Sequence, residues 1–508
     1  MFRTAELQRK LPKEDYRQQV PQLRQELLMM QMELRDAGFP VIVVFAGVDG
    51  AGKSETVNRL HEWMDSRWLI TRAFGDPSDE ERDRPEYWRF WRELPPKGRI
   101  GLFLSSWYSL PILDQVYGRT QLADFDERLE RIKAFEKTLA DDGVLILKFW
   151  MHLSKDAQKE RLRKLEKNPL LHWRVSKRDW QHWEMYDQFI AAAERTLLKT
   201  GNGLAPWKIV EGYDERYRSV TVATTIRDAT RFRLDEVKAG LVSGGGGETA
   251  AHPSIPAMDA NGSARVTVLS RLDMSKALDK DDYDASLKRY QAKLNQLQRT
   301  ARDRKVSTLL VFEGWDAAGK GGSIRRITAA LDARDYQVIQ IAAPTDEEAA
   351  HNYLWRFWRH LPRAGHVTIY DRSWYGRVLV ERIEGFARTR EWQRAYAEIN
   401  DFEAQLVESG IVLLKFWLHI TPEEQLRRFQ EREQIAYKAW KLTDEDWRNR
   451  ERWAGYELAV NDMVEHTSTR QAPWTLIEAN DKRHTRIQVL QTLCERMEAA
   501  LAGGSKQS

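Results

Sequence analysis

Two stretches of the chain pair a glycine-rich turn with a lysine at the spacing that suits phosphate binding. In the segment GWDAAGKGG, Gly314 is followed after four residues by Gly319 and Lys320. Consecutive backbone N–H groups of such a turn surround an anion, and the lysine ammonium reaches its outer oxygens. The segment GVDGAGKSE repeats the pattern from Gly47 to Lys53. Each stretch therefore predicts a site for a phosphorylated ligand.

Carboxylates and arginines accompany the second glycine-rich turn. The run HVTIY ends at Asp371 and is followed by RSWYGR. We expect Asp371 at the carboxyl end of a parallel strand, beside the turn, where such sheets bind ligands and where a metal-holding acid is needed. Asp316, inside the turn, supplies a second carboxylate for Mg²⁺. Arg372 and Arg377 would match phosphate oxygens in geometry and charge. Together these groups predict phosphoryl transfer.

The two halves differ at the residues that would carry the reaction. Lys320 is followed by Gly321, where the usual loop has a Ser or Thr that binds Mg²⁺, whereas the first half has the orthodox Ser54. The counterparts of Asp371, Arg372, Gly376 and Arg377 are Leu104, Ser105, Ser109 and Leu110. A leucine cannot bind magnesium, and losing the acid and both arginines removes more transition-state stabilisation than an absent hydroxyl would. We therefore expect catalysis in the second half. Binding of an unreactive phosphate ligand by the first half stays open.

The elements that must position these residues recur in both halves. Gly47 and Gly314 are 267 positions apart, and the same offset holds without a gap to Trp207 and Trp474. The expected elements are leading helices at 16–38 and 283–305, strands that enter each turn, strands at 98–104 and 366–371, strands at 144–153 and 411–420, and a fourth strand after each APW. Strands separated by helical stretches predict a parallel sheet that is covered on both faces.

A basic helical stretch follows the third expected strand in each half, at 155–169 and 422–453. Kinases with a phosphate loop place a mobile lid at this point of the chain. The alternative is a solvated charged face, which the charge pattern alone favours. The sequence leaves these two interpretations open.

Length and composition limit the number of domains, the kind of partner and the compartment of the protein. A chain of 508 residues exceeds one hydrophobic core, so the repeat predicts domains at 1–240 and 265–508, joined by a flexible Gly-, Pro- and Ala-rich linker at 241–264. The net charge of +4 shows no excess of the kind that coats nucleic acid. One cysteine, Cys494, excludes an internal disulfide and a multi-cysteine zinc site. The charged N-terminus and the strand-sized apolar runs predict a cytoplasmic protein that does not enter a membrane.

The motifs taken together resemble those of the family-2 polyphosphate kinases. The resemblance rests on GWDAAGKGG, DRSWYGR, LWRFWRHLP, a basic lid with WK, and APW, and it covers nearly the whole chain, once per half. It implies an α/β fold of two tandem P-loop kinase domains, each a parallel sheet covered by helices with a helical lid. Gly321 agrees with the pattern of that family. By position, the resemblance implies Asp316 and Asp371 as catalytic or metal-binding acids, and Lys320 and Arg372 as catalytic residues on the phosphates. The phosphate-binding set is Gly314, Ala317, Ala318, Gly319, Lys320, Gly321, Gly322, Arg377, Lys441 and Arg450.

The tandem architecture resembles that of polyphosphate:AMP phosphotransferases, so we expect a Mg²⁺-dependent transfer from inorganic polyphosphate to AMP, giving ADP. Alternatives within enzymes are an ADP acceptor and an ATP-dependent nucleoside monophosphate kinase, because the same cradle serves ATP. A regulator that binds polyphosphate or nucleotide without turnover is the alternative from another class, and Asp371 and Arg372 argue against it. The expected partners are polyphosphate and AMP or ADP, without nucleic acid or membrane. Chain-length and base preference, net direction and oligomeric state stay open, with a homo-oligomer as one alternative.

Overall fold

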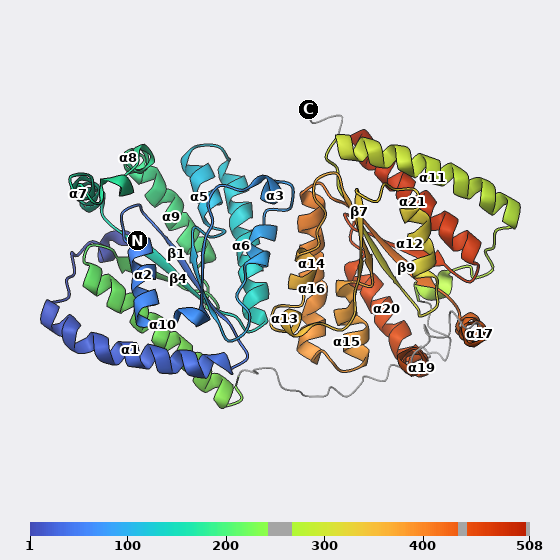
Figure 1. Ribbon diagram of the computed structural model, residues 1–508, viewed down its shortest axis with the longest axis horizontal. Helices are drawn as coiled ribbons and strands as arrows, with labels where there is room; N and C mark the ends of the chain where they lie inside the picture. Colours follow the sequence, from blue (N-terminus) through green and yellow to red (C-terminus); the bar gives the residue numbers. More distant parts are fainter. Residues whose placement is uncertain (242–266, 435–443, 504–508) are drawn as a thin grey trace. The chain divides into compact units, whose positions relative to one another are not determined.

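The computed structural model describes residues 1–241, 267–434 and 444–503, which form two compact units (Figure 1). The first unit takes most of its residues from the part of the chain before position 247, and the second from the part after it. Apart from Leu241, the predicted linker at 241–264 lies outside the described residues. The domain boundaries at 240 and 265 border this gap, so they stay predictions.

Each unit contains a parallel sheet of five strands. In the first unit the order is β2 (Leu69–Ala73), β3 (Ile100–Leu104), β1 (Val41–Gly47), β4 (Leu145–His152) and β5 (Trp207–Glu211). In the second unit it is β7 (Tyr336–Gln340), β8 (Val367–Asp371), β6 (Thr308–Gly314), β9 (Val412–His419) and β10 (Trp474–Glu478). The strand that enters each glycine-rich turn is thus the central one.

Helices cover both faces of each sheet (Figure 1). The helices of the first half are α1 (Lys13–Arg35), α2 (Lys53–Trp63), α3 (Asp79–Arg82), α4 (Trp88–Arg92), α5 (Ser109–Val116), α6 (Leu122–Asp141), α7 (Lys155–Glu166), α8 (Lys177–Glu184), α9 (Tyr186–Thr200) and α10 (Glu215–Lys238). Those of the second half are α11 (Lys280–Asp303), α12 (Lys320–Thr328), α13 (Asp346–Ala349), α14 (Trp355–Trp358), α15 (Val380–Ile383), α16 (Thr389–Glu408), α17 (Pro422–Glu433), α19 (Asp444–Glu451), α20 (Trp453–Thr467) and α21 (Lys482–Gly503).

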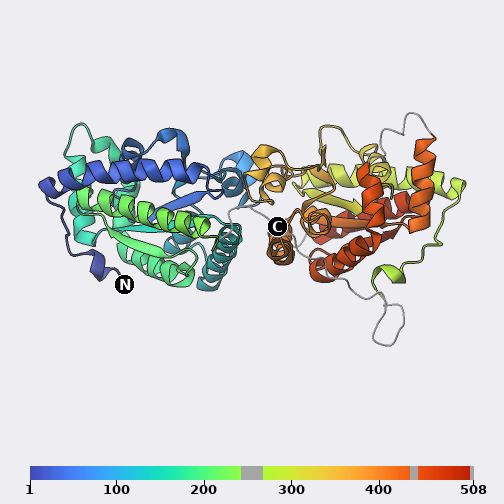
Figure 2. The same cartoon turned by 90° about the horizontal axis from the view of Figure 1, so that it is seen from below.

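The leading and closing helices of each unit lie side by side, α1 against α10 and α11 against α21 (Figure 2). They cover one face of the sheet, while α6 and α9 in the first unit, and α16 and α20 in the second, cover the other. Among the described residues, no helix is long and apolar enough to cross a membrane. The prediction of two parallel sheets covered by helices is confirmed.

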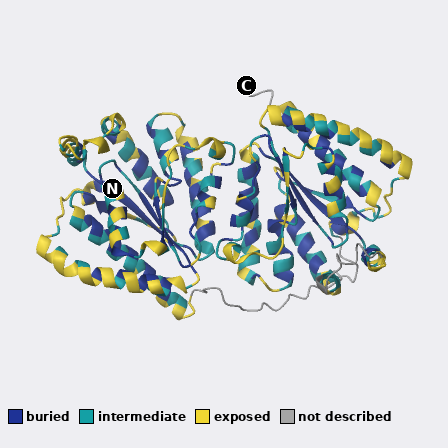
Figure 3. Ribbon diagram, in the orientation of Figure 1, coloured by how far each residue is buried: buried dark blue, intermediate teal, exposed yellow. Residues whose placement is uncertain are grey.

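The core of each unit lies along its sheet, where the strands are mostly buried (Figure 3). In β1 the run VIVVF is buried throughout, and β6 is buried from Thr308 to Glu313. Strands that are buried on both faces read as continuous apolar runs, which explains why these two were predictable.

One strand per unit was not predicted from the sequence. Four strands were expected in each half, whereas the structure adds β2 and β7, each at one edge of its sheet. In β7 no residue is fully buried, and its residues YQVIQ mix polar and apolar types. Such a short, half-exposed edge strand gives no run that stands out from a loop.

Candidate active site

The second glycine-rich turn connects β6 to α12. Gly314 ends β6 with a φ of +149°, and a Cβ there would lie 2.6 Å from the carbonyl oxygen of Leu418 in β9, so a side chain does not fit. Gly319 precedes α12 with a φ of +111° and is its N-cap. The turn therefore leads directly into the positive end of a helix, where backbone N–H groups are free to bind an anion.

A cavity of about 750 Å³ lies against this turn. Its lining consists of residues 316–323 together with Arg325, Asp371, Arg372, Arg428, Glu431, Arg432, Asp446, Asn449, Lys482, Thr485 and Arg486. Lysines and arginines outnumber the acids in this set, so the cavity attracts anions. Asp371 is the last residue of β8 and pairs in register with Phe312 of β6, which places it at the carboxyl edge of the sheet beside the turn. Acids, cations and turn thus face the same space.

Asp316 is held by two polar partners within the cavity. Arg372 donates from Nη2 to its Oδ1 at 2.9 Å, and Asn449 donates from Nδ2 to its Oδ2 at 3.1 Å. Burial acts to raise the pKa of Asp316, but the charges of Lys320 and Arg372 outweigh it and hold this pKa below its ordinary value. Asp316 is therefore ionised at neutral pH, and its negative charge can bind a cation.

Lys320 lies across the turn. Its Nζ donates to the carbonyl oxygens of Gly314 at 2.6 Å and of Trp315 at 3.3 Å. An ammonium group has three donors, so these two contacts fix the side chain and leave one N–H for a phosphate oxygen. The first unit repeats the arrangement, since Lys53 Nζ donates to Gly47 O at 2.7 Å and Val48 O at 3.0 Å.

A buried glutamate, Glu313, lies directly before the turn and was missed by the sequence analysis. Ser373 donates from Oγ to its Oε1 at 2.8 Å. Burial raises the pKa of Glu313, although the Ser373 hydrogen bond and the charges of Lys320 and Arg372 act in the opposite direction. Its counterpart in the first half is Ala46. Comparison of the halves was the signal that could have identified this residue.

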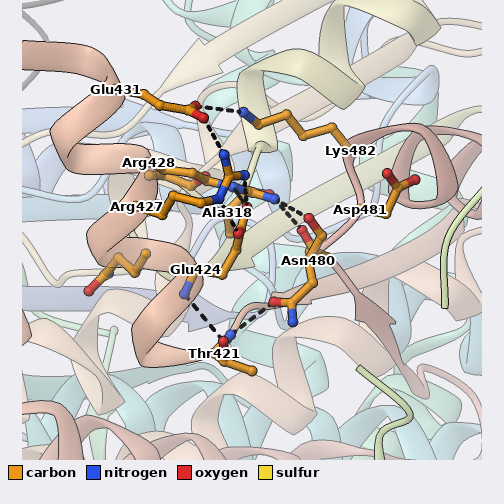
Figure 4. A network of polar contacts seen from close by, with 12 residues as sticks. Ala318, Thr421, Glu424, Arg427, Arg428, Glu431, Asn480, Asp481 and Lys482 are labelled. Atoms are coloured by element: carbon orange, nitrogen blue, oxygen red, sulfur yellow. Dashed lines mark hydrogen bonds and ion pairs between the residues drawn. The ribbon is translucent and has the colours of Figure 1, made fainter. Parts of the chain in front are cut away.

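Arg428 of α17 ties the turn to its surroundings (Figure 4). Its Nη1 donates to the carbonyl oxygens of Ala317 at 2.9 Å and Ala318 at 3.1 Å, and its Nη2 donates at 2.7 Å to those of Ala479 and Asn480. The side chain is 2% exposed. One guanidinium thus fixes the turn to both α17 and the segment before α21, which supports the preorganised cradle that phosphate binding requires.

The structure brings most of the predicted residues together but not all of them. Asp316, Lys320, Asp371 and Arg372 line one cavity with residues 317–319, 321 and 322 of the turn, while Gly314 contributes its carbonyl group to Lys320. Lys441 lies outside the described residues.

Two predicted arginines point elsewhere. Arg377 pairs through Nε with Glu381 at 3.1 Å and lies 4.4 Å from the ring centroid of Tyr353, and it does not line the cavity. Arg450 donates from Nη1 to the carbonyl oxygen of Pro422 at 2.7 Å and is also absent from the lining. In their place the cavity receives Arg325 and Arg432, together with Lys482, Thr485 and Arg486 from the start of α21. The α21 group follows the strand β10, so its place at the carboxyl edge of the sheet was the available signal.

The acids of the cavity suit a magnesium ion that keeps much of its water. Among residues 1–241, 267–434 and 444–503, no group of three or more His, Cys, Asp or Glu side chains is placed to hold a metal. Magnesium is commonly bound by one or two carboxylates, with phosphate oxygens and waters completing its shell. Asp316 and Asp371 on one cavity fit that requirement.

The first unit keeps the backbone of the site and the lysine of the turn, but not the acid at the end of β8 or the arginine that follows it. Leu104 pairs in register with Phe45 of β1, as Asp371 does with Phe312 of β6, so the leucine stands at the position of the acid. Ser105 has a φ of +52° and its counterpart Arg372 a φ of +64°. Both are left-handed conformations that a residue other than glycine seldom adopts.

Comparison with known proteins also divides the chain into two similar halves. The family model of polyphosphate kinase 2 (PPK2) matches residues 10–238 and again residues 277–503. A "Polyphosphate:AMP phosphotransferase" of Pseudomonas aeruginosa strain PAO1 is 50% identical over 503 residues, which cover 98% of this chain and 99% of the relative. A protein of the same name from Acinetobacter johnsonii is 38% identical over 464 residues, covering 90% and 91%.

A solved structure resembles the chain over its full length. The crystal structure of a Pseudomonas aeruginosa PA01 protein assigned to polyphosphate kinase 2 has a TM-score of 0.87 and 47% sequence identity, and the match covers 100% of both chains. The repeat read from the sequence therefore corresponds to two copies of one family fold.

Proposed function

The chain belongs to the polyphosphate kinase 2 family, and we propose that it transfers a phosphoryl group from inorganic polyphosphate to AMP, giving ADP. The observation that carries this proposal is the cavity of the second unit, where a phosphate-binding turn, two carboxylates and an excess of cations meet. The relatives that bear the name polyphosphate:AMP phosphotransferase, over nearly the whole chain, support AMP as the acceptor.

In the proposed reaction a phosphate oxygen of AMP bonds to the terminal phosphorus of polyphosphate. The bond from that phosphorus to the bridging oxygen breaks, and the chain leaves shorter by one phosphate. The backbone N–H groups of the turn hold the donor, and Lys320 and Arg372 offset the negative charge that grows on the transferred group. A divalent metal ion, for which we propose Mg²⁺ held by Asp316 and Asp371, would supply further charge stabilisation when bound.

The donor separates this proposal from its alternatives. Purified full-length chain should be assayed with AMP and Mg²⁺, with either long-chain polyphosphate or ATP as donor, while ADP formation is followed by chromatography. We expect ADP with polyphosphate and a much slower reaction with ATP. Faster turnover with ATP would identify a nucleoside monophosphate kinase instead. Phosphorylation of ADP but not of AMP would identify ADP as the acceptor. The absence of any turnover would favour a binding protein.

Rising salt should weaken the binding of the polyphosphate donor more than the binding of the nucleotide acceptor. A polyanion that contacts several cations releases condensed counterions on binding, as nucleic acids do, and this makes its affinity fall with rising salt. The apparent KM for long polyphosphate should therefore rise more steeply with NaCl than the KM for AMP. Lys482→Gln removes one cation of the cavity lining and should reduce the slope for polyphosphate. Equal slopes for the two substrates would contradict an extended basic track.

The proposal includes a cytoplasmic location and no nucleic-acid partner. The near balance of 80 basic and 76 acidic residues, and the single cysteine, support this setting.

A further inference from the structure

The first turn of α2, directly after the glycine-rich turn of the first unit, carries a carboxylate where α12 of the second unit has a glycine. Glu55 stands at the position of Gly322, 267 residues earlier. A Cβ built on Gly322 would lie 3.6 Å from Nη2 of Arg486, and both of these residues line the cavity of the second unit. A side chain at this position therefore points into the space that an anionic ligand would occupy.

Three guanidinium groups surround the Glu55 carboxylate. Its Oε2 accepts from Nη2 of Arg161 and from Nη2 of Arg218, each at 2.7 Å, and its Oε1 accepts from Nη1 of Arg174 at 3.2 Å. Arginine forks bind carboxylate and phosphate oxygens in the same way. The first unit thus shows the coordination of an oxyanion, with its own carboxylate in the position of the ligand.

Arg218 closes the turn from the other side. It is 0% exposed, and it donates from Nη1 to Gly212 O at 2.9 Å and from Nε to Thr56 Oγ1 at 3.1 Å. A Cβ on Gly52 would lie 2.2 Å from its Cζ, so the guanidinium packs directly on the residue that caps α2. The counterpart of this arginine in the second half is Thr485, which is small and leaves the turn open to the cavity.

The arginine at the base of the turn has also changed its partners. Arg161 is the counterpart of Arg428, which in the second unit donates to the carbonyl oxygens of Ala317 and Ala318. Arg161 instead directs Nη2 to both oxygens of Glu55. The cations that would meet a phosphate are thus already paired with a carboxylate.

We propose that the Glu55 carboxylate permanently occupies the phosphate cradle of the first unit, and that this cradle admits an inorganic phosphate or polyphosphate only when Glu55 is removed. A second anion beside Glu55 would have to break ion pairs with Arg161, Arg174 and the fully buried Arg218, and would leave a carboxylate without a partner. The first unit is thereby a latent oxyanion site, closed by one side chain. This inference does not depend on which nucleotide accepts the phosphoryl group.

Hydrogen–deuterium exchange on the full-length chain tests this proposal, with inorganic tripolyphosphate as the probe. In the parent chain the probe should slow amide exchange in the turn at 314–323 and leave the turn at 47–56 unchanged. In Glu55→Gly, which copies Gly322, both turns should be protected. A ligand at about four times its dissociation constant slows exchange from its site about fivefold. Glu55→Asp keeps the charge and serves as the matched control, without protection at 47–56.

Two results would overturn the proposal: protection of 47–56 in the parent chain, or a folded Glu55→Gly chain that gains none. If the glycine variant does not fold, Glu55→Ala removes both the charge and the volume of the side chain while avoiding a glycine inside α2, and it should gain protection in the same way. Adding Arg161→Ala to the glycine variant should abolish the gain. Missing protection at 314–323 would count against the proposed donor, while the comparison at 47–56 would still decide the role of Glu55.

Discussion

Lys320→Ala should abolish phosphoryl transfer almost completely, whereas Lys53→Ala should leave kcat nearly unchanged. Removing a cation that stabilises the transferring group costs about 10²-fold or more in rate. If the two units were equivalent sites, each substitution would remove about half of the activity. The first unit has Leu104 in place of the acid Asp371, and Ser105 in place of Arg372, so we expect only the second lysine to serve a reacting centre.

The two lysines form a matched pair for this experiment. Lys53 Nζ lies 2.7 Å from Gly47 O, and Lys320 Nζ lies 2.6 Å from Gly314 O. Truncation therefore removes two equivalent backbone contacts from each unit, so a large difference in kcat reports on chemistry. Steady-state kcat and KM should be measured for both variants, together with their thermal unfolding. An equal loss of kcat, or a larger loss from Lys53→Ala, would refute the assignment of catalysis to the second unit.

Asp371→Asn and Asp316→Asn should each reduce turnover by orders of magnitude while the fold is kept. The substitution preserves shape but removes the charge that the proposed metal ion requires. Asp371→Asn is easier to interpret than Asp316→Asn. Asp316 also pairs with Arg372, so removing its charge would change the position of that arginine as well.

Asp335→Asn is the control for these variants. Asp335 is 7% exposed and pairs with Arg302 at 3.2 Å, and it does not line the cavity. Its substitution should lower stability without lowering kcat. The measurements are kcat, the apparent affinity for Mg²⁺, and circular dichroism as a check of folding. A folded Asp371→Asn chain that keeps more than about a tenth of the parent rate would remove this acid from the mechanism.

The central strands were predictable because each contains an uninterrupted apolar run, VIVVF in β1 and LLVF in β6. β1 and β6 are buried on both faces, so their sequences identify them without knowledge of their neighbours. The edge strands β2 and β7 are half-exposed, and their composition resembles that of the loops around them. What defines them is pairing with β3 and β8, which lies beyond the reach of a local pattern.

The residues of the site also differ in how well a local sequence pattern predicts them. Asp316, Lys320, Asp371 and Arg372 belong to contiguous motifs at strand ends, so their juxtaposition follows from the topology of a parallel sheet. Arg428 reaches the turn from more than a hundred residues away in the chain, and no spacing rule connects the two. Arg377 is the converse case: it is close to the phosphate motif in sequence, but it pairs with Glu381 and does not line the cavity.

A local signal for Arg377 was nevertheless present. Glu381 stands four residues after it, and residues at this spacing meet on the surface of a helical turn. The same kind of signal applied to Glu55, since alignment of the two halves sets it against Gly322. The role of Glu55 became clear only from the three arginines around it, all of which follow it by more than a hundred residues.

The left-handed conformation shared by Ser105 and Arg372 bears on how such a duplicated chain evolves. A residue other than glycine with positive φ costs on the order of 1 kcal/mol, and the first unit bears this cost although it presents a serine there and not an arginine. The two units thus share a main-chain conformation at this position although the side chains differ. If catalysis belongs to the second unit, as proposed, the two units are separated by side chains at a few positions on a shared backbone, with Leu104, Ser105 and Glu55 foremost.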